Sequence, residues 1–232
     1  MNTLRSFLRV SIAVAAVAFA AHANANIIFL LGNNPQPDEE NILFNGPGTN
    51  PGPALTVTGA TNNTGLFVFF TGTEDLVTPA SGQARIEAVD GQFTTLTFGV
   101  VDGTFHDFIL NPRIFNIAGG PPAIGTITVT VDQVIGPDAV FTYGASSAGN
   151  NFLTILALDG QRIQNITIDS DAPLSFLDLQ QPRISGGFLC PPGSTDPRCT
   201  GLFIVPEPSV LSLLGLGLVA LAFAGPRRRR KN

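Results

Sequence analysis

The sequence has few of the residues that usually carry chemistry. It has no Trp, one Tyr, two His and two Cys, and its only Lys is Lys231. It also lacks a phosphate-binding loop and a dinucleotide fingerprint. These absences exclude the common nucleotide-dependent enzyme classes and leave a short set of candidate catalytic groups.

Positive charge is scarce outside the two ends of the chain. Arg5, Arg9 and the residues 227–231 supply seven of the twelve basic residues. The other five arginines face all seventeen acidic residues, so the middle of the chain has a net charge of about −12. An acidic surface of this kind repels nucleic acid, so no nucleic-acid partner is expected.

The N-terminus predicts a secretory signal peptide over residues 1–25. Arg5 and Arg9 precede the apolar run 10–21, and two Ala-x-Ala patterns follow at 21–23 and 23–25. The run is too short to cross a bilayer comfortably, which argues against a membrane anchor. We therefore expect a mature chain that begins at Asn24 or Asn26.

The C-terminus combines three features in a fixed order. The motif Pro206, Glu207 and Pro208 comes first, and the apolar stretch 209–225 follows it. A helix over this stretch would rise roughly 25 Å at 1.5 Å per residue, close to the ~30 Å core of a bilayer. Five consecutive cations come last: Arg227, Arg228, Arg229, Arg230 and Lys231. By the positive-inside rule they mark the cytoplasmic side, so the middle of the chain is expected to be exported.

This combination resembles the PEP-CTERM sorting tail of Gram-negative bacteria over about the last 28 residues, 205–232. The same segment is also labelled an ice-binding protein C-terminal domain, a label that describes the tail alone. The resemblance implies processing by a membrane-embedded exosortase, in bacteria that make exopolysaccharide and biofilm matrix. An ordinary tail anchor is the alternative. Residues 83–87 (Gln-Ala-Arg-Ile-Glu) and 181–186 (Gln-Pro-Arg-Ile-Ser-Gly) also resemble the domains found ahead of such tails, a resemblance that implies no activity.

Runs of β-forming residues recur about every ten residues through the middle of the chain, and no segment there has helical periodicity with caps. Asp-Gly turn signals separate several of the runs. The ten predicted strands are 55–58, 65–71, 83–89, 93–101, 105–110, 125–133, 139–143, 152–158, 163–169 and 174–179. The pattern predicts an all-β domain over 26–184, an antiparallel β-sandwich with a jelly-roll arrangement as the specific expectation.

Residues 185–204 are rich in Pro and Gly and are predicted to form a stalk. Cys190 and Cys199 lie in it, and in an exported chain they are expected to form a disulfide. Closing this loop would contribute roughly 2.5 to 3 kcal/mol, local to the stalk. A free reactive pair or a metal site is the alternative, but no His or third Cys accompanies the two.

Candidate catalytic and metal-binding groups are few, and we predict no catalytic residue and no cofactor. A Ser-His-Asp hydrolase would have to use His106, beside Asp107, because it is the one His of the mature domain. The stretch 144–149 looks like a nucleophile elbow but lacks its glycine spacing. Asp169 and Asp171 are the carboxylate pair to test for calcium, although their spacing matches no known calcium loop.

The sequence therefore predicts a non-enzymatic surface or extracellular-matrix protein that an exosortase sorts. It would be held in the inner membrane as a precursor, then reach the outer surface or the medium and associate with exopolysaccharide. Two alternatives stay open. One is a secreted hydrolase of matrix polysaccharide, with a pocket lined by His106 or by two facing carboxylates. The other is a structural adhesin that associates with copies of itself.

Overall fold

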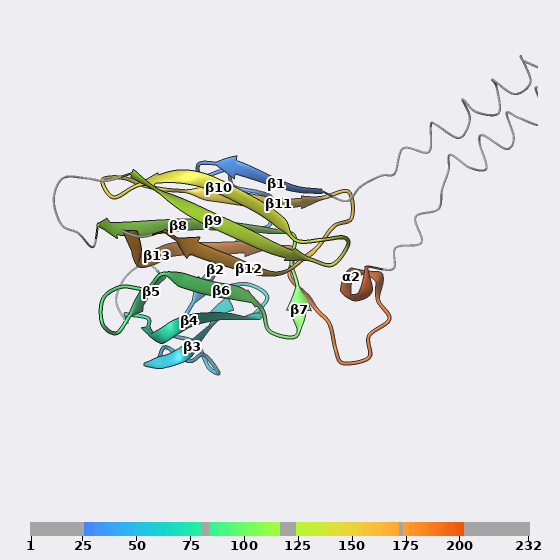
Figure 1. The fold of residues 1–232 in the computed structure, drawn as a ribbon. Coiled ribbons are helices and arrows are strands. Elements are labelled where there is room, and N and C mark those ends of the chain that lie inside the picture. The colour runs from blue at the N-terminus through green and yellow to red at the C-terminus, as the bar shows by residue number, and fades with distance from the viewer. Residues whose placement is uncertain (1–25, 80–83, 117–123, 172–173, 202–232) are drawn as a thin grey trace, which may run out of the picture. The chain divides into compact units, whose positions relative to one another are not determined.

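The computed structural model describes residues 26–79, 84–116, 124–171 and 174–201 (Figure 1). The predicted signal peptide, the motif Pro206-Glu207-Pro208, the apolar stretch 209–225 and the basic residues 227–231 all lie outside these ranges. Within the described ranges, no helix is long and apolar enough to cross a membrane.

Strands make up most of the described chain, which confirms the prediction of an all-β, antiparallel domain. Each of the ten predicted runs overlaps a strand. The elements are β1 (Asn26–Leu31), β2 (Glu40–Leu43), β3 (Ala54–Thr61), β4 (Phe67–Val77), β5 (Arg85–Ala88), β6 (Thr95–Val100), β7 (Gly103–Thr104), β8 (Asp107–Asn116), β9 (Ile124–Gln133), β10 (Ala139–Ser146), β11 (Leu153–Leu158), β12 (Ile163–Ser170), β13 (Leu174–Ser185), β14 (Phe188–Leu189) and the helix α2 (Pro197–Thr200).

Twelve of these strands belong to one hydrogen-bonded sheet, rather than to the two separate sheets of the expected sandwich. β5 pairs with both β4 and β13, so the ring β13-β2-β3-β4-β5 closes into a five-stranded antiparallel barrel. Two arms extend from this barrel. The first arm is β8, β11 and β1, and the second is β6, β12, β9 and β10.

The two arms pack face to face over a core whose largest side chains are phenylalanines. Phe29 of β1 stacks on Phe141 of β10 with ring centroids 4.8 Å apart, and Phe98 of β6 lies 4.3 Å from Phe108 of β8. Six phenylalanine side chains in the described ranges are fully buried: Phe70, Phe93, Phe98, Phe105, Phe108 and Phe176. Each such burial contributes about 1.5 to 3 kcal/mol, so these rings are a main source of stability.

The segment 186–201 is folded against the domain, which differs from the predicted stalk. β13 continues to Ser185, and β14 then pairs with β7. Gly201 is packed so closely that a Cβ there would lie 2.6 Å from the carbonyl oxygen of Val134. The folded domain therefore extends to Gly201, and we call residues 186–201 the clip.

Candidate ligand-binding groove

The candidate site arises where the hydrogen-bond ladder of β13 is interrupted. On one side β13 pairs with β8, while on the other it pairs first with β5, through Asp178 to Gln180, and then with β2, through Arg183. Gln181 and Pro182 lie between these two partners. Gln181 has a φ of 50°, the register shifts here, and Pro182 has no N–H to donate. The bulge leaves an opening between β5 and β2.

An open groove of about 400 Å³ occupies this opening. Its lining residues are Asn33, Asn41, Leu43, Ala84, Gln181, Pro182 and Arg183. Three side-chain amides and one guanidinium offer hydrogen-bond donors and acceptors, and the other three side chains offer apolar surface. A mixture of convergent polar groups with apolar contacts is typical of a site for a neutral or polar small ligand.

Arg183 is the charged group of the groove, and its position is fixed by neighbours on the β1–β2 connection. Its Nη1 donates to Glu39 Oε2 at 3.0 Å, and its Nη2 donates to the side-chain oxygen of Asn33. Glu39 also accepts a 3.0 Å bond from the backbone N–H of Gln36. The Nε of Arg183 is buried without a partner in the described part of the chain. The guanidinium is therefore held in place with its charge compensated, and it retains an unmet donor.

The groove brings together the two stretches that the sequence singled out. Gln180 lies opposite Arg85, and the backbone N–H of Gln181 donates to the carbonyl of Ala84 at 2.9 Å. The other contributors, Asn33, Asn41 and Leu43, lie outside these stretches and were not predicted. Asn41 lies on β2, a strand of only four residues, which is too short to give a clear alternation.

A second polar feature, on β13 next to the groove, is the buried carboxylate of Asp178. Arg113 Nη1 lies 3.1 Å and Arg85 Nη1 3.9 Å from its Oδ2, and Gln180 Nε2 donates to the same oxygen at 3.3 Å. Burial raises the pKa of Asp178, and the charge of Arg113 acts in the opposite direction. Its Oδ1 is buried with no partner in the described ranges.

The hydrolase candidate His106 does not bridge its neighbours Asp107 and Ser185 in the described structure. The Ser185 hydroxyl donates to Asp107 Oδ1 rather than to the imidazole. Burial, with the nearby charge of Glu39, raises the pKa of Asp107 to about 7. Burial and the charge of Arg162 lower the pKa of His106. Serine and aspartate are thus paired directly, without the His between them that a triad requires.

Of the calcium candidates, the Asp169 side chain is bonded within the sheet, and Asp171 is an exposed residue just after β12. Asp169 Oδ1 accepts a 2.7 Å bond from Thr95 Oγ1, and the backbone N–H of Asp171 donates to Thr126 at 3.3 Å. Across the described ranges, no three His, Cys, Asp or Glu side chains are grouped as metal ligands.

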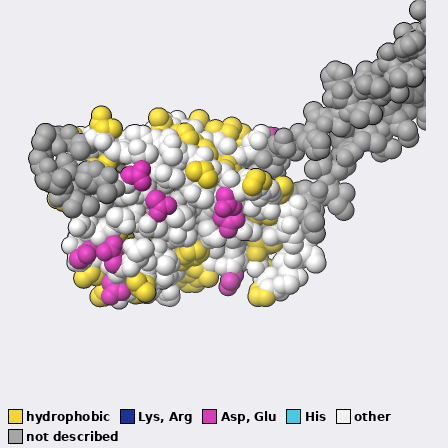
Figure 2. Space-filling view, in the orientation of Figure 1, with side chains coloured by type: hydrophobic (Ala, Val, Ile, Leu, Met, Phe, Trp, Pro, Cys, Tyr) yellow, Lys and Arg dark blue, Asp and Glu magenta, His cyan; other side chains and the backbone are white. Residues whose placement is uncertain are grey.

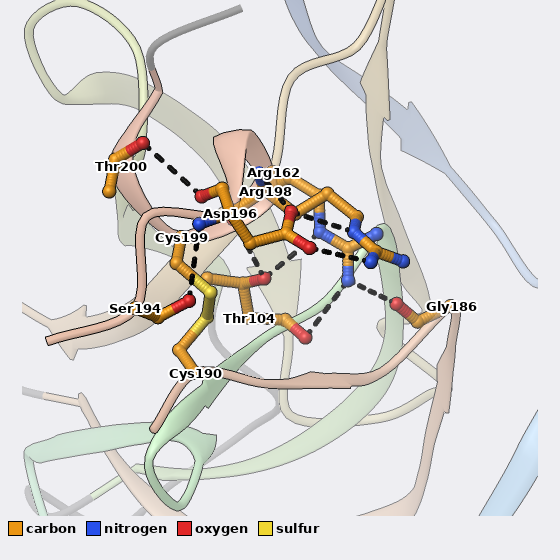
Figure 3. The surroundings of a disulfide bond; sticks show 9 residues. All are labelled: Thr104, Arg162, Gly186, Cys190, Ser194, Asp196, Arg198, Cys199 and Thr200. Carbon is orange, nitrogen blue, oxygen red and sulfur yellow. Dashed lines mark hydrogen bonds and ion pairs between the residues drawn. A yellow bond between two sulfur atoms is a disulfide. The ribbon is translucent and has the colours of Figure 1, made fainter. Parts of the chain in front are cut away.

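The clip contains the expected disulfide, Cys190–Cys199, with Cα atoms 5.6 Å apart (Figure 3). Asp196 caps α2 by accepting a 2.9 Å bond from the backbone N–H of Arg198. The guanidinium of Arg198 lies 3.4 Å from the ring centroid of Phe188, within cation–π range. Thr104 of β7 donates to the carbonyl of Arg198 at 3.2 Å. The disulfide, the cap and the cation–π contact lie within the clip, while the Thr104 bond and the pairing of β14 with β7 attach it to the domain and give it a structural role.

No protein family, curated protein or solved structure matches this chain, so its function is argued from the groove and from the sequence of its two ends.

Proposed function

We propose that the protein is an exported, exosortase-sorted surface or matrix protein of a Gram-negative bacterium, and that its β domain binds exopolysaccharide without catalysing a reaction. The observation that carries the binding half is the groove at the β13 bulge. The sorting half rests on the sequence of the tail.

The chemistry of the groove suits a saccharide. Sugar hydroxyls both donate and accept hydrogen bonds, and the amides of Asn33, Asn41 and Gln181 can do the same toward them. Leu43 and Pro182 offer apolar surface to the C–H faces of a sugar ring. The groove lining contains neither His106 nor two facing carboxylates, which favours binding over hydrolysis.

The ends of the domain are compatible with a precursor held by both termini. Asn26 pairs with Leu158, whose carbonyl accepts from the backbone N–H of Gln161. The Gln161 side chain donates to the carbonyl of Ile135 at 2.7 Å, and Gly201 packs beside Ile135. The first and last described residues therefore lie at the same end of the domain, an arrangement that suits a chain threaded with both ends inside the cell.

Affinity electrophoresis of the full chain, in detergent, through gels that contain the host exopolysaccharide tests the binding half. We expect the polymer to retard the wild type, and the double change Asn41→Ala with Gln181→Ala to abolish most of the retardation. Gln164→Ala, an amide change on β12, is the matched control and should migrate like the wild type. Equal migration of all three proteins with and without polymer would remove the binding claim.

A further inference from the structure

Three arginines, one each from β5, β8 and β13, lie on one face of the sheet. On β8, Arg113 lies opposite Asp178, and Ile109 lies opposite Arg183. Residues 109 and 113 point to the same face of β8 because they are an even number of residues apart. Arg113 and Arg183 therefore share that face, and Arg85 joins them from β5 through its contact with Asp178. Three of the domain's five arginines gather within a few residues of the groove.

This face is an exception in an acidic domain. Residues 26–201 contain five arginines against sixteen Asp and Glu, a net charge of −11. The other two arginines, Arg162 and Arg198, are engaged in the contacts around the clip. Figure 2 shows another face, where acidic and apolar side chains are scattered and no basic side chain is visible.

The guanidinium groups of Arg85 and Arg113 contact the buried Asp178 on one side and solvent on the other. Their side chains are 36% and 43% exposed, whereas that of Asp178, which both approach, is 1% exposed. Arg85 Nη2 also pairs with Glu87 Oε1 at 2.8 Å. A guanidinium has five N–H donors, so each group keeps donors for a ligand on the solvent side. The buried carboxylate fixes the two heads and reduces the entropy cost of ordering them in a complex.

We propose that Arg85 and Arg113 form a subsite for the carboxylate groups of an acidic polysaccharide, whose chain continues along β13 into the groove beside Arg183. The inference rests on the proposed function and names its ligand class, a uronate-bearing polymer. Guanidinium and carboxylate match in geometry and charge and form two parallel hydrogen bonds, which a neutral sugar does not offer. Asp178 and Glu87 balance the two arginines, so binding depends on direct contact rather than on long-range attraction.

Polygalacturonate, with dextran as the neutral polymer, probes this subsite on the full chain in detergent. We expect the wild type to bind polygalacturonate at least several-fold more tightly than dextran. Arg85→Gln with Arg113→Gln should abolish that preference. Glu87→Gln removes a competing carboxylate and keeps both arginines, so it should tighten polygalacturonate binding several-fold. Arg198→Gln removes one positive charge at the clip and should leave the preference unchanged.

The set of variants separates this inference from a purely structural role. If Arg85→Gln with Arg113→Gln fails to fold because Asp178 loses its partners, Glu87→Gln still decides the matter, since a structural ion pair predicts no gain in affinity. Equal affinity of the wild type for the two polymers would overturn the inference and leave the proposed function standing. Absence of binding to either polymer and to the host exopolysaccharide would overturn both.

Discussion

Removing the disulfide should destabilise the whole domain, because the clip is docked rather than free. The change is Cys190→Ser together with Cys199→Ser, which opens a loop whose ends are nine residues apart. In the chain-entropy model a loop of this length contributes about 2.7 kcal/mol. The clip contacts Thr104, which also accepts a 2.9 Å bond from the buried Arg162, so the loss should reach the core.

For a domain of this size, 1 kcal/mol shifts the melting temperature by about 2 to 4 °C, so the double variant should melt roughly 5 to 11 °C lower. Circular dichroism on heating measures the shift. Wild type treated with dithiothreitol serves as the control, and it should melt like the variant, which in turn should not respond to the reductant. A double variant that melts within 1 °C of the oxidised wild type would show that the clip is an independent appendage.

Three further changes probe the core, a buried charge and the tail. Gly125→Ala would place a Cβ 1.5 Å from the Leu174 side chain, so urea titration should show a free energy of unfolding about 1 to 3 kcal/mol lower than that of the wild type. Gly149→Ala is the control, because a Cβ there meets open space and should leave the free energy of unfolding unchanged. Asp107 has a pKa of about 7 in the folded state against an ordinary 3.8, so the unfolded chain releases a proton that the folded chain keeps. Wild-type stability should therefore fall by up to about 4 kcal/mol as pH rises from about 4 to 7 and then level off, and Asp107→Asn should lack this slope in urea titrations at pH 4, 6 and 8. Neutral replacements at 227–231 should leave the domain folded but mislocalised in cell fractionation; loss of folding would contradict the modular organisation.

Ten of the described strands were predictable from local pattern, whereas β1, β2, β7, β14 and the arrangement of the strands were not. Alternation such as that of residues 126–131 identifies a strand with one buried face, and runs of β-forming residues between turn signals identify the others among the ten. It does not identify partners. β5 closes the barrel by pairing with β4, its near neighbour in sequence, and with β13, which lies about ninety residues away. The groove depends on that closure and on the bulge at Gln181, so neither could be derived from periodicity.

In the clip, composition predicted the backbone conformation but not the docking against the domain. Its prolines and glycines predict an irregular backbone, which the structure has over most of residues 190–196. Composition does not report tertiary contacts, and here β14, the carbonyl of Arg198 and Gly201 attach the irregular segment to the domain. The disulfide was predictable because cysteine pairing in an exported chain follows from two residues and a compartment.

Mass spectrometry of the protein isolated from its native host tests the export and sorting claim most directly. We expect mature material that begins at Asn24 or Asn26 and ends ahead of the 209–225 stretch, with the described domain intact. Glu207→Ala should instead accumulate as a membrane-held precursor that keeps its tail. Mature wild-type protein that still ends at Asn232 would contradict the claim.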